Sequence, residues 1–132
     1  MNVTHRERLR DTIPTVWIGW EMEQQVTGIA GKTALVTGST RGIGRVTAEK
    51  LVAAGVNVVV HGRHAADVEH TVAELSRDGV TVLGFTADLS KHNEAHALAD
   101  QVLAAVPQLD ILVNNAGAST KESFWEVSDE SW

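Results

Sequence analysis

The chain has 132 residues, a formal net charge of −6 and no cysteine, and 43% of its residues are hydrophobic. This length and composition suit one domain with a packed core, while the acidic balance argues against a nucleic-acid or acidic-membrane partner. The missing cysteines exclude disulfides and thiolate metal sites. The apolar stretch from Ile13 to Trp20 is far shorter than a membrane span, and the mixed charges around it do not fit a targeting leader. We therefore expect a cytoplasmic protein.

From Lys32 onward, short apolar runs alternate with segments whose apolar residues recur at helical spacing. The runs predict strands over residues 33–37, 56–60, 81–86 and 110–114. The segments between them predict helices over residues 43–54, 65–77 and 91–106. Gly55 is placed to end the first helix, and Ser90 is a suitable N-cap for the third. The alternation predicts an α/β fold with a doubly wound parallel sheet and right-handed crossovers.

The first expected helix carries an apolar stripe, and the second expected strand is almost wholly β-branched. The stripe consists of Ile43, Val46, Thr47, Leu51 and Ala54. A β-branched run such as residues 56–60 is typical of a strand that is buried on both faces. Outside this pattern, residues 1–28 are expected to form a poorly ordered extension. A further N-cap and helical turn are expected from Ser128.

Three glycines lie between the first expected strand and the first expected helix, in the segment Thr37-Gly-Ser-Thr-Arg-Gly-Ile-Gly44. Gly38 lets the backbone turn sharply, Gly42 lets it approach a pyrophosphate, and Gly44 lets the helix pack close to the strand. The helix N-terminus offers N–H groups and a partial positive charge to an anion. A tight connection without a ligand is the alternative, but the position between strand and helix favours a phosphate site.

Together with two later motifs, the glycine segment resembles the short-chain dehydrogenase/reductase family. These motifs are Ala87-Asp-Leu89 after the third strand and Asn114-Asn-Ala-Gly117 after the fourth. The resemblance covers about residues 29–132. It implies an NADP-binding, Rossmann-like half-domain, truncated after about four strands and incomplete at its C-terminus.

The resemblance also assigns roles to individual residues of a nicotinamide-dinucleotide site. It implies that the glycine segment holds the pyrophosphate through Gly38, Ser39, Thr40, Arg41, Gly42, Ile43 and Gly44. Asp88 would pair with the adenine amino group, and Leu89 would pack beside the ring. The ribose side would be lined by Asn115, Ala116 and Gly117. All these positions follow parallel strands, at the edge where open α/β sheets bind ligands.

The residues after the second strand favour NADP over NAD as the cofactor. An NAD site usually places a carboxylate there to accept hydrogen bonds from the ribose hydroxyls, whereas this chain has His61-Gly-Arg63. The Arg63 guanidinium would meet a 2′-phosphate, with Arg41 reaching from the glycine segment, because an arginine donates two N–H groups to a phosphate. The alternative is that both arginines are merely solvated. His61 would add positive charge only at low pH.

Four further polar residues have structural interpretations. Asp88 could be a surface carboxylate near a helix, and Asn114 is expected to be a buried amide that ties neighbouring strands together. His92 and His96 lie four residues apart on the third helix, but no carboxylate or cysteine completes a metal-ligand set there. We therefore expect a solvated helix face and no metal.

The resemblance implies hydride transfer between a nicotinamide and a small-molecule carbonyl or alcohol, using a serine, a tyrosine and a lysine. The chain contains no tyrosine, so no catalytic residue is assigned in it. It is interpreted as the nucleotide-binding portion of an NADP-dependent oxidoreductase, 3-oxoacyl reductase-like at a general level. A non-catalytic nucleotide-binding or regulatory module and an inactive gene remnant stay open as alternatives. Full-length relatives usually form homo-oligomers, and the fourth strand is expected to have an uncovered edge.

Overall fold

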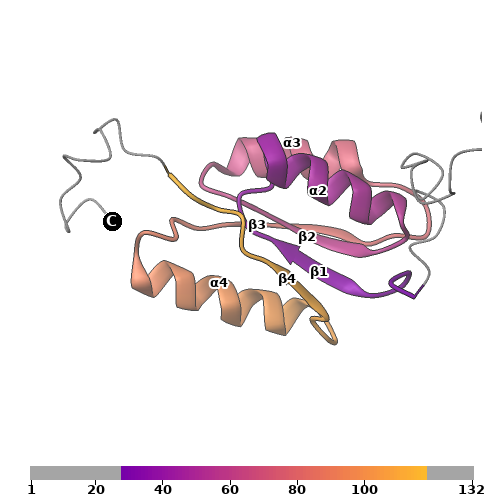
Figure 1. Ribbon diagram of the computed structural model, residues 1–132. Coiled ribbons are helices and arrows are strands. Elements are labelled where there is room, and N and C mark those ends of the chain that lie inside the picture. The colour runs from indigo at the N-terminus through magenta and orange to yellow at the C-terminus, as the bar shows by residue number, and fades with distance from the viewer. Residues whose placement is uncertain (1–27, 119–132) are drawn as a thin grey trace, which may run out of the picture.

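In the computed structural model, which describes residues 28–118, parallel strands form one sheet with helices on both faces (Figure 1). The strands are β1 (Thr33–Val36), β2 (Asn57–Gly62), β3 (Val82–Thr86) and β4 (Ile111–Val113). The helices are α2 (Gly42–Ala53), α3 (Ala65–Leu75) and α4 (His92–Ala105). The strand order β3-β2-β1-β4 follows the 3-2-1-4 start of the Rossmann arrangement. The predicted doubly wound parallel fold is confirmed.

Some expectations concern other parts of the chain. Apart from Gly28, the extension expected over residues 1–28 lies outside the described residues, and so does the helical turn expected from Ser128. Within residues 28–118, no helix combines the length and the apolar character that a membrane crossing requires.

The two faces of the sheet are covered by different helices, α2 and α3 on one side and α4 on the other (Figure 1). Along β2, Val58 and Val60 belong to the core beneath α2 and α3, whereas Val59 packs with Leu98 and Val102 of α4. The three β2 valines are at most 1% exposed. The β-branched run is therefore buried on both faces, as its composition predicts.

Helix α2 ends at the glycine that the sequence pattern indicated. Gly55 has a φ of 80°, and its N–H donates to the Val52 carbonyl (3.0 Å). The Val56 N–H donates to the Leu51 carbonyl (3.0 Å). These two bonds form a Schellman motif, which satisfies carbonyls that the last helical turn leaves unpaired.

The buried face of α2 differs from the predicted apolar stripe. Its buried residues are Gly44, Ala48 and Val52. Ile43 and Val46, by contrast, are 80% and 53% exposed. Small side chains at two of the buried positions let the helix backbone lie close to the strands, so close packing selects this face over the larger apolar residues. The C-terminal part of the predicted stripe still packs against the core in part.

Two helix boundaries also differ from expectation. The N-cap of α4 is Lys91 rather than Ser90, because the Ser90 hydroxyl donates to the Asp88 carboxylate (2.7 Å) instead of capping the helix. Helix α3 ends at Leu75, two residues before the predicted end at Arg77. There Arg77 already takes part in an isolated bridge that closes the following turn.

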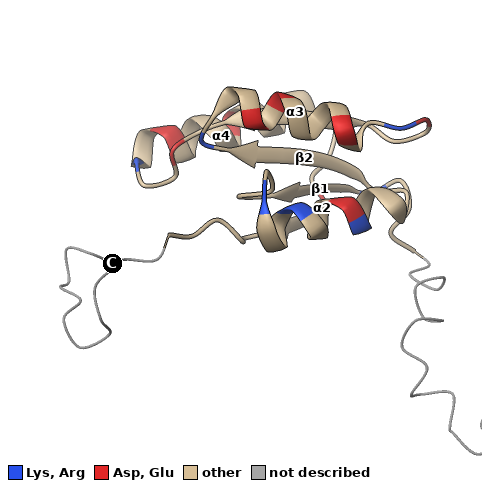
Figure 2. Ribbon diagram, turned by 90° about the horizontal axis from the view of Figure 1, so that it is seen from above, with Lys and Arg blue, Asp and Glu red and all other residues tan. Residues whose placement is uncertain are grey.

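Charged residues of both signs lie on α2, and acidic residues lie along α3 (Figure 2). Arg45 of α2 donates to Glu49 on its own helix (2.9 Å) and to Glu74 on α3 (2.8 Å). The Arg45 side chain is only 18% exposed, so its apolar stem packs against the protein. Arg45 therefore joins the two helices that cover this face of the sheet.

Candidate nucleotide-binding site

The glycine segment connects the end of β1 to the start of α2 through two left-handed residues. Gly38 has a φ of 64° and Gly42 a φ of 58°, a region that is unfavourable for residues with a Cβ atom. A Cβ at Gly38 would also lie 3.0 Å from the Ala116 Cα, so space and conformation both require glycine there. The residue between them that caps α2, Arg41, makes no side-chain hydrogen bond to the helix.

Gly44 is required for a different reason, which is the close approach of two segments. A Cβ at this position would overlap the Asn115 Nδ2 and the Gly38 carbonyl oxygen. The first turn of α2 therefore lies directly against the glycine turn and the segment after β4. This agrees with the predicted close packing of helix and strand at the third glycine.

Thr37 and Asn115 join the glycine segment to the end of β4. The Asn115 Nδ2 donates to the carbonyls of Thr37 (3.0 Å) and Gly38 (3.2 Å). The Thr37 Oγ1 accepts the N–H groups of Asn115 (3.0 Å) and Ala116 (2.9 Å) and donates to the Val113 carbonyl (3.3 Å). This hydroxyl uses its donor and both of its acceptor positions, so the segment after β4 is held firmly against β1.

The expectation that Asn114 is a buried amide that joins neighbouring strands is wrong, because Asn115 makes these hydrogen bonds instead. Asn114 is exposed, whereas Asn115 is partly buried and makes the bonds between the two segments. Successive residues of an extended chain point in opposite directions, so only one of two adjacent asparagines can face the glycine turn. The sequence alone could not decide which one.

His61, near the end of β2, is a buried hydrogen-bonding residue that the sequence analysis treated as a minor feature. It is 2% exposed, its Nδ1 accepts the Gly38 N–H (3.1 Å), and its Nε2 lies 3.1 Å from the Ala87 carbonyl. The backbone of His61 also makes two hydrogen bonds with Ser39. The Ser39 N–H donates to the His61 carbonyl (2.9 Å), and the His61 N–H donates to the Ser39 Oγ (3.0 Å). Ser39 is itself fully buried and has a structural role here.

Burial lowers the pKa of His61, because desolvation penalises the imidazolium form, and the bond to the Ala87 carbonyl offsets only part of this. The lowered pKa agrees with the expectation that His61 would carry positive charge only at low pH. The sequence did contain a signal for the structural role of His61, because this polar residue directly continues a run of valines that was expected to be buried. Buried polar groups need hydrogen-bond partners.

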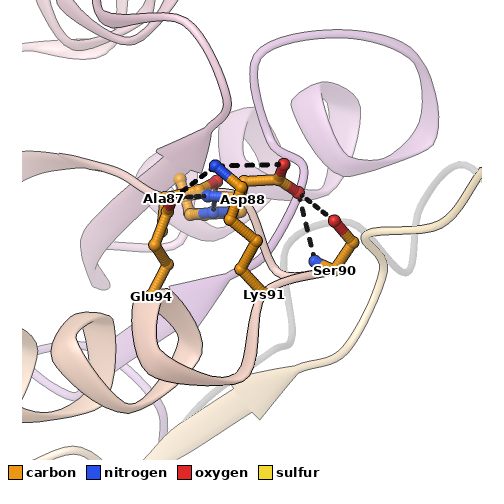
Figure 3. A network of polar contacts seen from close by, with 6 residues as sticks. Ala87, Asp88, Ser90, Lys91 and Glu94 are labelled. Carbon is orange, nitrogen blue, oxygen red and sulfur yellow. Dashed lines mark hydrogen bonds and ion pairs between the residues drawn. The ribbon is translucent and has the colours of Figure 1, made fainter.

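Asp88 follows β3 and lies in a local network with the start of α4 (Figure 3). Its Oδ1 accepts the Ser90 N–H (3.1 Å) and hydroxyl (2.7 Å), and its own N–H donates to the Glu94 Oε2 (2.7 Å). Lys91 donates to the other Glu94 oxygen (2.8 Å). The pKa of Asp88 is lowered, first by the Ser90 hydrogen bonds and then by the positive charges of Lys91 and Arg63. The carboxylate is thus ionised and oriented beside the loop.

A cavity of about 490 Å³ opens at the carboxyl ends of the strands. Nine of the predicted site residues line it: Gly38, Thr40, Arg41, Arg63, Asp88, Leu89, Asn115, Ala116 and Gly117. Four others do not: Ser39, Gly42, Ile43 and Gly44. Of these, Ser39 and Gly44 are buried, whereas Gly42 and Ile43 are exposed. The tertiary structure therefore brings residues from four loops to one cavity.

Two lining residues near the start of α3 were missed by the sequence analysis. His64 is the N-cap of α3 and makes no side-chain hydrogen bond to it, and Asp67 is an acidic residue in its first turn. The cavity thus holds the uncapped N-termini of α2 and α3, together with both predicted arginines. Helix N-termini and guanidinium groups are favourable partners for phosphate.

The described residues offer no comparable arrangement for a metal ion. No group of three or more histidine, cysteine, aspartate or glutamate residues within 28–118 is placed to hold one. The rings of His92 and His96 on α4 lie edge to face, with their centroids 5.2 Å apart.

Comparison with known proteins finds relatives of this chain among oxidoreductases. Residues 32–132 match a family model described as short chain dehydrogenase. An uncharacterized oxidoreductase of Bacillus subtilis, YvrD, is 45% identical over 101 residues, which is 76% of this chain and 38% of that protein. The 3-oxoacyl-[acyl-carrier-protein] reductase FabG of Aquifex aeolicus is 36% identical over 105 residues, which is 79% of this chain and 42% of the reductase.

Solved structures with bound cofactor share the fold. L-sorbose reductase from Gluconobacter frateurii, complexed with NADPH and L-sorbose, has a TM-score of 0.72 and 35% identity over 80% of this chain and 40% of its own. The RhlG/NADP complex of Pseudomonas aeruginosa has a TM-score of 0.70 and 38% identity over 80% of this chain and 41% of its own. This chain therefore spans about two fifths of the length of these relatives.

Proposed function

Since this chain belongs to the short-chain dehydrogenase family, we propose that residues 29–132 form the NADP-binding part of an oxidoreductase. The observation that carries the proposal is the cavity at the carboxyl ends of the strands, which the glycine turn and two arginines line. Open α/β sheets bind dinucleotides at this edge. NADP would supply the hydride acceptor, and its reduced form the hydride donor.

The residues present fit the parts of a dinucleotide. The left-handed Gly38 lines the cavity with backbone and no side chain, beside the uncapped start of α2, and this suits the pyrophosphate. Leu89 and the oriented Asp88 carboxylate suit the adenine ring and its amino group. The segment at Ala116, which Thr37 anchors, suits the ribose side.

The choice of NADP over NAD rests on Arg63 and Arg41. Both are exposed and line the cavity near the end of β2, where a 2′-phosphate would accept their N–H groups. Asp67 lines the same cavity and acts in the opposite direction, because a carboxylate repels a phosphate and accepts bonds from ribose hydroxyls. We propose that the two arginines prevail, and the NADPH and NADP complexes of the structural relatives support this.

The activity of the whole protein is part of the proposal, because the chain spans about two fifths of its relatives. We propose hydride transfer between the nicotinamide and a carbonyl or alcohol carbon of a small molecule, in a homo-oligomeric protein of the cytoplasm. The Aquifex aeolicus relative suggests 3-oxoacyl thioesters as one substrate class.

Titration of the purified chain with NADPH and NADH, followed by calorimetry, tests the cofactor site. We expect saturable binding that is tighter for NADPH. Arg63→Ala should weaken NADPH binding about tenfold and leave NADH binding unchanged, because one charge-assisted phosphate contact is lost. Arg77→Ala, in an exposed turn outside the cavity, is the matched control. Equal loss for both cofactors would contradict the assigned 2′-phosphate contact, and no binding at all would contradict the site.

A further inference from the structure

His61 connects three segments that meet at the candidate site. It lies in β2, its Nδ1 accepts the Gly38 N–H of the glycine turn (3.1 Å), and its Nε2 contacts the Ala87 carbonyl after β3 (3.1 Å). The imidazole is 2% exposed and also borders the cavity. Each ring nitrogen therefore has one backbone partner, and water has little access to replace either.

The two partners allow only one protonation state of the ring. The Gly38 N–H is a donor, so Nδ1 must carry a lone pair, and the Ala87 carbonyl is an acceptor, so Nε2 must carry the proton. A protonated imidazole has a donor at both nitrogens. Its Nδ1–H would then face the Gly38 N–H, and the bond that holds the glycine turn would be lost.

The segments that His61 joins are those that shape the cavity. Gly38 is one of the left-handed residues of the turn, and Asp88, directly after Ala87, lines the same cavity. We propose that neutral, Nε2-protonated His61 is a positioning residue that holds these two segments in register, so that its protonation weakens dinucleotide binding. The inference rests on the proposed function, because it concerns the same cofactor.

Charged or titratable groups from several neighbouring segments border the same cavity. They are Arg41 from the glycine turn, Arg63 and His64 after β2, Asp67 on α3 and Asp88 after β3. Simple charge attraction predicts that an additional positive charge at His61 would tighten the binding of a phosphate. The positioning role predicts the opposite sign. Burial, which lowers the pKa of His61, also opposes a role as a phosphate-binding cation.

Two substitutions separate the titration of His61 from its packing. His61→Asn keeps an acceptor for the Gly38 N–H near the Nδ1 position, lacks the donor to Ala87 and cannot be protonated, so its NADPH binding should change less with pH than that of the wild type. His61→Leu leaves the Gly38 N–H without an acceptor and should bind about tenfold more weakly than His61→Asn at every pH. His96→Gln, at an exposed position on α4, is the control for histidine loss away from the cavity.

The test combines NADPH titrations between pH 8 and pH 5 with nitrogen-15 NMR of the imidazole in the full chain. NMR should show protonated Nε2 and unprotonated Nδ1 at pH 8. As the ring becomes protonated, wild-type binding should weaken about tenfold more than that of His61→Asn, which shares every other titrating group, including the phosphate. If the ring stays neutral to pH 5, the positioning role is tested by the ratio of the NADPH dissociation constants of His61→Leu and His61→Asn at pH 8.

Several results would overturn the inference. They are the opposite tautomer, the same pH dependence in wild type and His61→Asn while the ring titrates, tighter wild-type binding at low pH, or equal binding by His61→Leu and His61→Asn. Saturable binding at pH 8 with any of these results would overturn this inference alone. No binding by any variant at pH 8 would instead overturn the proposed function, and the inference with it.

Discussion

Val59 of β2 and Leu112 of β4 lie in the same row of the sheet, each paired with Leu35 of β1. Residues in register point to the same face. Val59 is 1% exposed beneath α4, whereas Leu112 is 54% exposed. Two apolar residues in equivalent positions thus have opposite environments among the described residues.

The two strands differ in how they are held in place. Apolar packing on both faces stabilises β2, through Val58 and Val60 on one side and Val59 on the other. Strand β4 packs Ile111 and Val113 against the core on one side, and polar groups at its ends add further bonds. At one end the Thr37 hydroxyl binds the segment after β4, and at the other the Asp110 carboxylate accepts the Thr33 N–H (2.9 Å). Each substitution below tests one side of this difference, with the free energy of unfolding measured by urea denaturation.

Gly44→Ala should have the largest effect on the β4 side. The added methyl group would overlap the Asn115 Nδ2 and the Gly38 carbonyl, so the segment after β4 must move away from β1. We expect the free energy of unfolding to fall by about 3 kcal/mol. Gly79→Ala is the control, because Gly79 has a φ of 80° with open space around it. Its cost should be about 1 kcal/mol, and equal losses for the two would contradict the crowding argument.

Thr37→Val should remove the polar fastening while preserving the side-chain shape. The Ala116 N–H loses its acceptor and the Asn115 N–H keeps only the Val113 carbonyl (3.1 Å), while Thr37 is only 6% exposed. Unfolding free energy should fall by about 2 kcal/mol, because partly buried donors and acceptors that lose a partner are costly. Thr37→Ser keeps the hydroxyl and should lose less than about 1 kcal/mol. A valine variant as stable as the serine variant would show that these bonds contribute nothing.

Val59→Ala and Leu112→Ala measure the packing difference within one row. Removing two buried methyl groups from Val59 should cost about 2 kcal/mol, including the cavity that remains. Leu112→Ala removes more atoms but should cost about 0.5 kcal/mol or less, because much of this side chain already meets solvent. A loss at Leu112 as large as that at Val59 would mean that another part of the chain covers β4.

Asp110→Asn should have the smallest effect, visible in the pH dependence of stability. The Thr33 N–H, and then the Lys32 charge, hold the pKa of Asp110 below its usual value. Ionised Asp110 therefore stabilises the fold above pH 3.8, and this contribution is lost as the pH falls through the lowered pKa. The unfolding free energy of Asp110→Asn should fall less between pH 7 and pH 3 than that of the wild type. Asp78→Asn, in an exposed turn, is the control for removing one carboxylate elsewhere, and a change in slope as large as that of Asp110→Asn would contradict the role of the Thr33 bond.

Local sequence features predicted most of the fold correctly, because they act through short-range physics. Alternating apolar runs and helical spacing identified all of the described strands and helices, with each end within about two residues of the observed one. Gly38, Gly42 and Gly55 have a positive φ, a conformation that glycine adopts in such turns more easily than other residues do. The order of motifs along the chain also indicated which loops meet, because parallel strands end at one edge of the sheet.

Contacts between distant segments decided the rest. The residues that the helix α2 buries depend on how closely it approaches the strands, and this favoured Gly44 and Ala48 over Ile43. The direction of the chain after β4 made Asn115, rather than Asn114, the residue that faces the glycine turn. His61 became a neutral link because Gly38 and Ala87, far apart in the sequence, place a donor and an acceptor on either side of it. Residue type and spacing thus determined the elements and the edge where they meet, and only packing in three dimensions determined which side chains face one another there.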